Sequence, residues 1–302
     1  MNTDAKHVNT PGSPLEKIVT YGRMIKFSHT VFALPFALAA MVLANRHTPA
    51  TVYTVSWILV AMITARSAAM GFNRIVDAKI DARNPRTAMR EIPSGKLSRK
   101  AAVVFVTVSA LLFILAAGML GRLCLLLSLP VLAVLFLYSY TKRFTWLAHL
   151  YLGFSIALAP LGTWIAMTNR FSWTILLLSF ALMTYITGFD ILYACQDTRF
   201  DKQEGLFSIP AKFGSQKALT AARVVHFISW CFFLGLWYAF DLGLIYFCTA
   251  LFIGILLVIE HRLVHPDDLS KINLAFFHVN SVISVMLFLG ILVDELTRIW
   301  TT

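Results

Sequence analysis

The sequence is poor in charged side chains, and poorest in acidic ones. Only 14% of its 302 residues are Asp, Glu, Lys or Arg, whereas about a quarter is usual in soluble domains. Hydrophobic residues make up 58%, and the mean hydropathy is +0.73. This composition excludes an ordinary water-soluble domain and is typical of a protein that crosses a membrane several times. It also makes each of the 15 acidic residues informative.

Cysteines and linker-like stretches are scarce as well. Four cysteines are scattered singly along the chain, and their spacing fits neither a disulfide framework nor a zinc site. No tract rich in proline, glycine or serine divides the sequence. We therefore expect a polar N-terminal segment over residues 1–20 and a single membrane domain over residues 21–302.

Long apolar runs are what the sequence has in abundance. A membrane-spanning helix needs about 20 mostly apolar residues. Nine runs of this kind are present, at residues 25–45, 52–72, 101–120, 123–140, 146–167, 173–195, 218–238, 241–259 and 273–294. The sequence thus predicts an all-α polytopic membrane bundle of nine transmembrane helices.

The positively charged residues indicate how the spans are oriented. When alternate loops are assigned to opposite sides of the membrane, 20 of the 26 Lys and Arg residues fall on the side of the N-terminus. Because cytoplasmic loops carry the excess of such residues, the N-terminus is predicted to be cytoplasmic. Topology and anionic lipids explain the net charge of +11, so we expect contact with a lipid bilayer and no nucleic acid.

Five acidic residues form two similar groups at the predicted cytoplasmic ends of two spans. They are Asp77 and Asp81, preceded by Asn73, and then Asp190, Asp197 and Asp201. The first group spreads over about 80° of one helical face, and the second falls within about 40° if its helix continues. Asp77 and Asp197 are 120 residues apart, as are Asp81 and Asp201, which a parallel internal duplication would produce.

Two rows of carboxylates at one membrane surface repel each other unless cations lie between them. Oxygen-rich sites of this kind suit Mg²⁺, which is commonly shared with phosphate oxygens. The alternative is a solvated acidic face that neutralises nearby Lys and Arg side chains, the usual explanation for a single pair four residues apart. We favour the metal site because both groups lie on the same side and at the ends of spans.

The residues in both groups resemble the motifs of UbiA-type intramembrane prenyltransferases. Residues 73–81, with the sequence N-R-I-V-D-A-K-I-D, are similar to the first motif N-x-x-x-D-x-x-x-D, and residues 190–202 to the second. Flanking segments agree: Asn84-Pro-Arg-Thr87, Ile92-Pro-Ser-Gly95 and Ser208-Ile-Pro-Ala-Lys-Phe-Gly214. Arg74 departs from the pattern, because many members carry Asp there, and it is not counted as a metal ligand.

The resemblance implies a bundle around a central cavity, with motif loops that cap it on the cytoplasmic side of a bacterial-type inner membrane. Members use Mg²⁺ to transfer a polyprenyl chain from polyprenyl diphosphate to an acceptor that is usually aromatic. The sequence is most similar to 4-hydroxybenzoate polyprenyltransferases, including relatives in the futalosine route to menaquinone. We expect transfer to a small 4-hydroxybenzoate-type acid in quinone biosynthesis, or alternatively to a hydroxynaphthoate-type acid, and we predict no protein partner.

By the same resemblance, Asn73, Asp77 and Asp81 would hold one Mg²⁺ ion, while Asp197 and Asp201 would hold another. The four aspartates are thereby the expected catalytic residues, since metal ions and fixed cations stabilise the departing diphosphate.

Substrate contacts are expected from neighbouring side chains. Lys142 and Arg143 form a basic loop suited to diphosphate oxygens. Tyr193 offers an aromatic face to a carbocation. Asp190 lies seven residues before Asp197, deeper in the predicted span, and is expected to orient a ligand, an arginine or the acceptor.

Arg66 stands inside a predicted span, where a guanidinium is costly and normally has a partner. It precedes Asn73 by seven residues and therefore lies within about 20° of it on the same helical face. Two interpretations stay open. Arg66 binds the diphosphate or the carboxylate of the acceptor, or it forms a structural pair with Asp190 or another buried acid.

Other readings of the polar residues are weaker. An ion-coupled transporter would place its carboxylates near the middle of the membrane, whereas these lie at the ends of spans. His261 and His265 have no evident third ligand, which favours a loop-facing pair over a zinc site. Single histidines on apolar runs, His149 and His226 among them, are expected to be hydrogen-bonded core residues.

Overall fold

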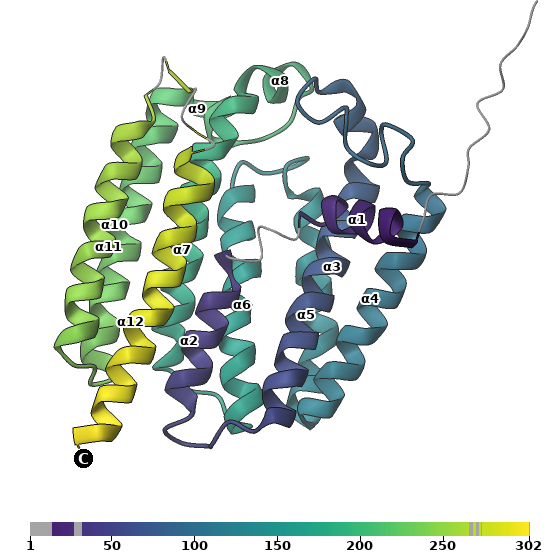
Figure 1. Cartoon of the computed structure of the whole chain (residues 1–302). Coiled ribbons are helices and arrows are strands. Elements are labelled where there is room, and N and C mark those ends of the chain that lie inside the picture. The colour runs from purple at the N-terminus through teal and green to yellow at the C-terminus, as the bar shows by residue number, and fades with distance from the viewer. Residues whose placement is uncertain (1–13, 27–31, 266–267, 270–271, 273, 302) are drawn as a thin grey trace, which may run out of the picture.

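The computed structural model describes residues 14–26, 32–265, 268–269, 272 and 274–301. In this part of the chain, helices stand side by side as a bundle (Figure 1), and eight of them are long and apolar enough to cross a membrane. They are α3 (Val52–Arg83), α4 (Arg99–Leu120), α5 (Arg122–Thr141), α6 (Ala148–Thr168), α7 (Ile175–Ala194), α10 (Ser215–Ala239), α11 (Leu244–Leu263) and α12 (Asn280–Thr301). The prediction of an all-α polytopic bundle is confirmed.

Shorter elements complete the fold. The 3-10 turn η2 (Cys195–Asp197) and α8 (Thr198–Gln203) continue α7, and the π-helical turn η3 (Leu274–Val279) leads into α12. Helices α1 (Pro14–Met24), α2 (Leu34–Ala44) and α9 (Ile209–Phe213) are too short to span a bilayer.

The first of the nine predicted spans, residues 25–45, is not a membrane-length helix among the described residues. Its helical part is α2, whose 11 residues reach about 16 Å, roughly half of the hydrocarbon thickness. Seven of those residues are buried, so their apolar character serves packing within the bundle. Residues 27–31 lie outside the described part of the chain. Among the described residues, the structure therefore has eight helices of spanning length instead of the nine predicted.

The described residues on either side of positions 27–31 contact different parts of the bundle. Lys26 accepts a hydrogen bond from Arg66 with its carbonyl oxygen, while Arg46, just after α2, pairs with Glu295 near the end of α12. These contacts lie toward opposite ends of the bundle. We call the end that carries Asp81 and Asp197 the motif end.

Helix α3 extends about three turns beyond the predicted boundary at residue 72. The apolar run stops there, but the helix continues to Arg83 because its polar side chains face a cavity inside the bundle rather than lipid. It ends where Pro85 follows Asn84, since the residue before a proline disfavours the helical conformation. Asn84 accordingly adopts extended backbone angles, with φ −87° and ψ 117°.

Helix α7 lies at the centre of the packed half of the bundle, between α6 and α10. Its buried residues, including Leu182, Tyr185 and Ile186, form a core with α2, α10, α11 and α12. Gly153 lets α6 approach closely, because a Cβ atom there would lie 2.2 Å from the carbonyl oxygen of Met183 on α7. This contact fixes the spacing of the two helices that carry the site residues His149 and Asp190.

Candidate active site

A polar cavity of about 160 Å³ lies at the motif end, among α3, α5, α7 and the connecting loops. Nine of the ten residues predicted to form the site line it: Asn73, Asp77, Asp81, Lys142, Arg143, Asp190, Tyr193, Asp197 and Asp201. The structure thus brings the two acidic motifs together around one space.

The first acidic row lies on the last turns of α3. Asn73 Nδ2 donates to Asp77 Oδ2 at 2.9 Å, and Arg143 Nη2 donates to Asp77 Oδ1 at 3.0 Å. One turn further on, Arg90 Nη1 donates to Asp81 Oδ1 at 2.6 Å. Asp81 Oδ2 is buried and has no hydrogen-bond partner among the described residues. Arginines from two loops therefore neutralise this row and leave one carboxylate oxygen unpaired.

The second acidic row is less regular than a continuous helix would make it. Helix α7 ends at Ala194, and η2 intervenes between Asp190 and Asp201, so the α-helix does not continue through the motif. A 3-10 helix turns about 120° per residue instead of 100°, which rotates the later side chains by about 60° over three residues. The expected 40° alignment is corrected accordingly, although all three carboxylates still line the cavity.

Asp197 is bound by the loop that follows α3. Arg86 grips it with two nitrogens, Nε at 2.9 Å from Oδ1 and Nη2 on Oδ2, and Asn84 Nδ2 donates to Oδ1 at 3.1 Å. Asp201 instead accepts a hydrogen bond from the Ser208 hydroxyl at 2.8 Å. Ser208 also caps α9, so its hydroxyl ties the α8–α9 connection to the acidic motif.

Lys142 brings a positive charge among these carboxylates. Burial acts to lower the pKa of Lys142, but the negative charges of Asp201, Asp190, Asp197 and Asp77 outweigh it and raise the pKa above its usual value. The ammonium group makes no hydrogen bond or ion pair with another described residue. Lys142 is therefore a charged donor that is available to an anion in the cavity.

Tyr193 is surrounded by cations. Arg86 Nη1 donates to its hydroxyl at 3.0 Å, and the same guanidinium lies 5.2 Å from the ring centroid. The Lys26 ammonium is 5.9 Å from that centroid. Burial, and then the positive charges of Arg74 and Arg90, lower the pKa of Lys26 from 10.5 to about 8. The ring of Tyr193 thus already serves as a surface on which positive charge rests.

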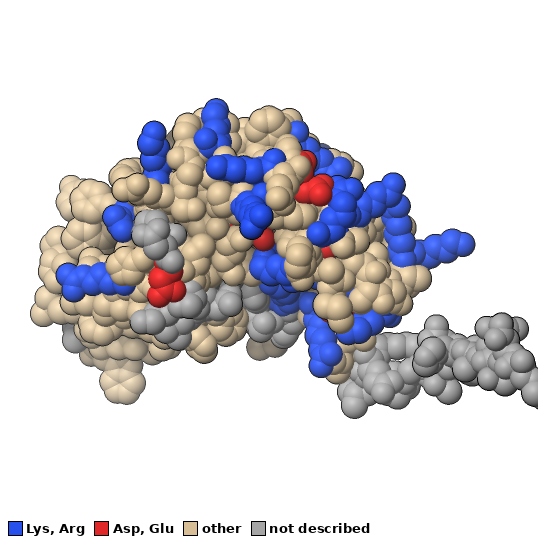
Figure 2. All heavy atoms as spheres, turned by 90° about the horizontal axis from the view of Figure 1, so that it is seen from above, with Lys and Arg blue, Asp and Glu red and all other residues tan. Residues whose placement is uncertain are grey.

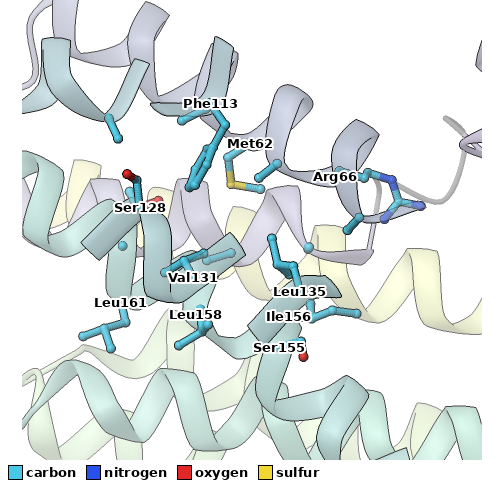
Figure 3. Close-up of a pocket in the computed structure, with 18 of the residues that line it drawn as sticks. Met62, Arg66, Phe113, Ser128, Val131, Leu135, Ser155, Ile156, Leu158 and Leu161 are labelled. Atoms are coloured by element: carbon cyan, nitrogen blue, oxygen red, sulfur yellow. The ribbon is translucent and has the colours of Figure 1, made fainter. Parts of the chain in front are cut away.

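Arg66, the tenth predicted residue, lines a second cavity of about 310 Å³. This space is almost wholly apolar and is enclosed mainly by α3, α4, α5 and α6 (Figure 3). Arg66 Nη2 donates to the Lys26 carbonyl at 3.2 Å, whereas Nε is buried without a partner among the described residues. Tyr138 lines both cavities, which places the apolar space next to the polar one.

Asp190 is held by His149, not by Arg66. His149 is fully buried at the start of α6, and its Nδ1 lies 2.6 Å from Asp190 Oδ2. The suggested structural pair between Arg66 and Asp190 is therefore not formed. Of the expected core histidines, His226 does bond within the core, to the Tyr185 carbonyl at 3.1 Å, whereas His149 belongs to the site.

The oxygen donors of the cavity fit Mg²⁺ in one particular way. Among the described residues, no three His, Cys, Asp or Glu side chains are grouped so that they could hold a metal ion by themselves. Mg²⁺ is often bound by one or two carboxylates that share it with waters and substrate phosphates. Asp81, with its unpaired buried oxygen, and the exchangeable partners of Asp77 and Asp197 suit such shared binding.

The surface over the site is strongly positive. Figure 2 views the bundle from the motif end and shows many Lys and Arg side chains, with acidic side chains visible in only a few small places. A cleft rimmed by one sign of charge attracts ligands of the opposite sign. This face is suited to draw in an anion such as a diphosphate.

Several site residues were missed from sequence. From the sequence alone, Arg86 and Arg90 are only loop charges, and Asn84 and Ser208 are only parts of flanking segments. The one sequence feature that points to Asn84 and Arg86 is that they flank Pro85, which ends α3 just after the first motif. Nothing in the sequence distinguishes His149 from a core histidine.

Comparisons with known proteins agree with this geometry. Residues 33–282 match the UbiA prenyltransferase family. The 4-hydroxybenzoate octaprenyltransferase of Vibrio campbellii is 25% identical over 92% of this chain and 98% of its own length. That of Vibrio atlanticus is 30% identical over 86% of this chain and 91% of its own length.

Solved structures share the fold. The apo structure of a UbiA homolog from Aeropyrum pernix K1 has a TM-score of 0.80 at 30% identity, covering 88% of this chain and 98% of that one. A UbiA homolog from Archaeoglobus fulgidus bound to GPP and Mg²⁺ has a TM-score of 0.69 at 17% identity, covering 90% and 99%. The chain, an integral membrane protein with multiple candidate spans, belongs to the UbiA prenyltransferase family of transferases.

Proposed function

We propose that the protein uses Mg²⁺ to transfer a polyprenyl chain from polyprenyl diphosphate to an aromatic acid of the 4-hydroxybenzoate type, in quinone biosynthesis. The observation that carries this proposal is the junction of the two cavities. A space lined by aspartates, arginines and Lys142 adjoins an apolar space, and Tyr138 lines both. A prenyl diphosphate has the same division between a charged head and an apolar tail.

The polar cavity is matched to the diphosphate. Lys142 and Arg143 line it from the loop after α5, while Arg86 and Arg90 line it from the loop after α3. Charge-assisted hydrogen bonds from these groups would hold the phosphate oxygens. Mg²⁺, held by Asn73 and the aspartates of both motifs, would neutralise the negative charge that develops on the leaving diphosphate. The chemistry would then occur at the motif end of the bundle.

The apolar cavity is matched to the isoprenoid chain. Its lining runs along α3 from Ile58 to Met70, a distance of about 18 Å along the helix axis. The facing walls come from α5 and α6, with Leu135 and Ile156 among the labelled side chains (Figure 3). Burial of the chain against these groups excludes water from the reacting carbon, which a carbocation-like transition state requires.

Arg66 supplies a site for the carboxylate of the acceptor. It is the one arginine in the lining of the apolar cavity, and its Nε has no partner among the described residues. A buried guanidinium with unpaired N–H groups favours a planar anion. In the reaction, the ring carbon beside the hydroxyl forms a bond to the allylic carbon as the C–O bond to diphosphate breaks. The ring then loses one proton.

The transporter alternative is not supported, because the acidic residues lie at helix ends and the family is one of transferases. For orientation, we infer that the motif end faces the cytoplasm of a bacterial-type inner membrane. The excess of Lys and Arg in the loops at this end supports that assignment.

The test uses the purified full-length protein in lipid nanodiscs with Mg²⁺ and a series of prenyl diphosphates. Prenylated product is expected from 4-hydroxybenzoate, and hydroxynaphthoates are run in parallel because they share the carboxylate and hydroxyl groups. Asp77→Asn and Asp197→Asn are each expected to abolish turnover while the protein keeps its helical circular dichroism. Asp241→Asn is the matched control, since Asp241 lies at the opposite end and is paired with Arg298.

Two results would contradict the proposal. Full activity in both Asp77→Asn and Asp197→Asn would show that these aspartates do not bind a required Mg²⁺. Product from a hydroxynaphthoate but none from 4-hydroxybenzoate would keep the chemistry and replace the acceptor.

A further inference from the structure

We propose that His149 is a positioning residue that holds Asp190 ready to take the hydroxyl proton of the aromatic acceptor. The proposal deepens the function above and rests on it. His149 is 0% exposed, its Nδ1 is 2.6 Å from Asp190 Oδ2, and the Asp190 side chain is 17% exposed toward the polar cavity. A buried imidazole thus supports a carboxylate that a substrate can reach.

The second ring nitrogen of His149 fixes the tautomer. The backbone N–H of Ile209, at the start of α9, donates to His149 Nε2 at 3.3 Å. A nitrogen that accepts this bond carries no proton, so the proton of the neutral ring is on Nδ1. Nδ1 therefore donates to Asp190 Oδ2. The tautomer of His149 is thus determined by a backbone N–H group, that of Ile209.

This arrangement leaves Asp190 with one oxygen occupied and one available. Oδ2 accepts the bond from His149, and no described residue donates to Oδ1. Because Nε2 is already bonded to Ile209, His149 acts as a fixed donor and not as a proton relay. It orients the carboxylate and stabilises its negative charge. A histidine that orients a catalytic carboxylate in this way acts through its partner.

The proton balance of the step is simple. As the ring attacks the allylic carbon, the O–H bond of the acceptor breaks and its proton passes to Asp190 Oδ1, while the electron pair stays on the ring oxygen. The proton on the attacked ring carbon then leaves to the released diphosphate, which the reaction itself supplies. Asp190 returns its proton to the ring oxygen, and the aromatic product leaves.

The His149–Asp190 pair is also linked to the connection between α8 and α9. Ser208 binds Asp201 through its hydroxyl, and the next residue, Ile209, binds His149 through its amide. Two consecutive residues therefore connect the second acidic motif to the His149–Asp190 pair. When Ser208 and Ile209 make these two hydrogen bonds, His149 is held in the Nδ1–H tautomer and orients Asp190.

The first test is a double-mutant cycle on kcat/KM for the acceptor, with full-length protein in nanodiscs. His149→Leu is expected to lower this value about tenfold or more. The Kd of geranyl diphosphate with Mg²⁺ should stay within about twofold. In Asp190→Asn, adding His149→Leu should lower activity little further, because the two residues act as a unit. His149→Gln should restore most of the loss, since its amide both donates and accepts.

A second test removes only the backbone donor. Ile209→Pro deletes the N–H group, and proline is tolerated at the first position of a helix. Ser208 already has the extended angles φ −143° and ψ 159° that a following proline requires. Ile209→Ala controls for the lost side chain. Nitrogen-15 NMR should show His149 as the Nδ1–H tautomer in the wild type and in Ile209→Ala, and should show a mixture in Ile209→Pro.

The outcomes separate the two levels of the proposal. If the wild type prenylates no aromatic acid, the proposed function fails, and this role fails with it. If the wild type is active but His149→Leu weakens donor binding as much as acceptor turnover, His149 is only structural. The same conclusion follows if the effects of His149→Leu and Asp190→Asn multiply. His226→Gln, a buried histidine on α10, controls for general disturbance of the bundle.

Discussion

Arg86 binds Asp197 through two nitrogen atoms and so joins the loop after the first acidic motif to the second motif. In the proposed reaction, Mg²⁺ and diphosphate meet at this same carboxylate. The guanidinium must then exchange at least part of its bond to Asp197 for bonds to phosphate oxygens. Arg86 thus connects the ligand-free arrangement of the site to its loaded one.

This exchange predicts that Arg86→Gln lowers kcat/KM for the prenyl diphosphate selectively. Charge-assisted hydrogen bonds contribute about 1.5–3 kcal/mol each, which corresponds to about 10- to 100-fold in kcat/KM for the prenyl diphosphate. KM for the acceptor should change much less. Arg83→Gln is the matched control, because Arg83 pairs with Glu204 at the surface with 57% of its side chain exposed. Equal losses in the two variants, measured by steady-state kinetics, would show that Arg86 has no special role.

Asp81 predicts a change in the metal requirement. Its Oδ2 is buried without a partner among the described residues, and a carboxylate oxygen of this kind is a suitable Mg²⁺ ligand. Asp81→Asn should raise the Mg²⁺ concentration that gives half-maximal activity by about tenfold or more. Asp268→Asn, outside the cavity lining, should leave it unchanged. A magnesium titration at saturating donor is the measurement, and an unaltered midpoint in Asp81→Asn would exclude this residue as a ligand.

The acidic motifs could be placed from sequence because helical spacing is local. Asn73, Asp77 and Asp81 share a face whatever packs around α3, and a long continuous helix preserves that face. The partners of these residues could not be placed. Which arginine of a loop reaches which carboxylate depends on where the chain turns, and Arg86 meets Asp197 only through tertiary packing.

The two errors in the fold have similar causes. Residues 25–45 are apolar enough for a span, but composition does not distinguish a short helix buried inside a bundle from one that faces lipid. The 40° alignment of the second motif holds only if the helix continues from Asp190 to Asp201, and a 3-10 turn that no residue pattern predicts interrupts it. The role of His149 could not be predicted either, because a lone histidine on an apolar helix belongs to no periodic pattern.

The pKa of Lys26 predicts how donor use depends on pH. Burial and the neighbouring arginines lower this pKa to about 8, so the ammonium is charged below that pH and neutral above it. Because a charged Lys26 attracts the diphosphate, kcat/KM for the donor should fall as pH rises through about 8. This parameter reports groups of the free enzyme. Lys26→Gln should have a lower kcat/KM for the donor at pH 7, and this value should not fall further as pH rises through about 8. Lys79→Gln, at an exposed position, should keep the pH-dependent fall of the wild type.

Orientation in the membrane predicts which loops a membrane-impermeant thiol reagent reaches. Ser94→Cys, in the exposed loop between α3 and α4, should react only from the cytoplasmic side of oriented vesicles. Thr48→Cys, exposed in the loop between α2 and α3 at the opposite end, should react only from the other side. The two positions control for each other. Labelling of Ser94→Cys exclusively from the outer side would invert the topology.

Gly162 predicts how the apolar cavity selects the donor. This glycine of α6 lines the cavity, and a Cβ atom there would have no neighbour within 4 Å. Gly162→Leu should therefore place a side chain in the cavity without disturbing the helix. A long donor needs that volume more than geranyl diphosphate does. The kcat/KM for the long donor, divided by that for geranyl diphosphate, should therefore fall about tenfold or more. Gly235→Leu on α10, where a Cβ atom also has no neighbour within 4 Å but the residue does not line the cavity, should leave the ratio unchanged. If Gly162→Leu slows both donors equally, the apolar cavity does not hold the chain.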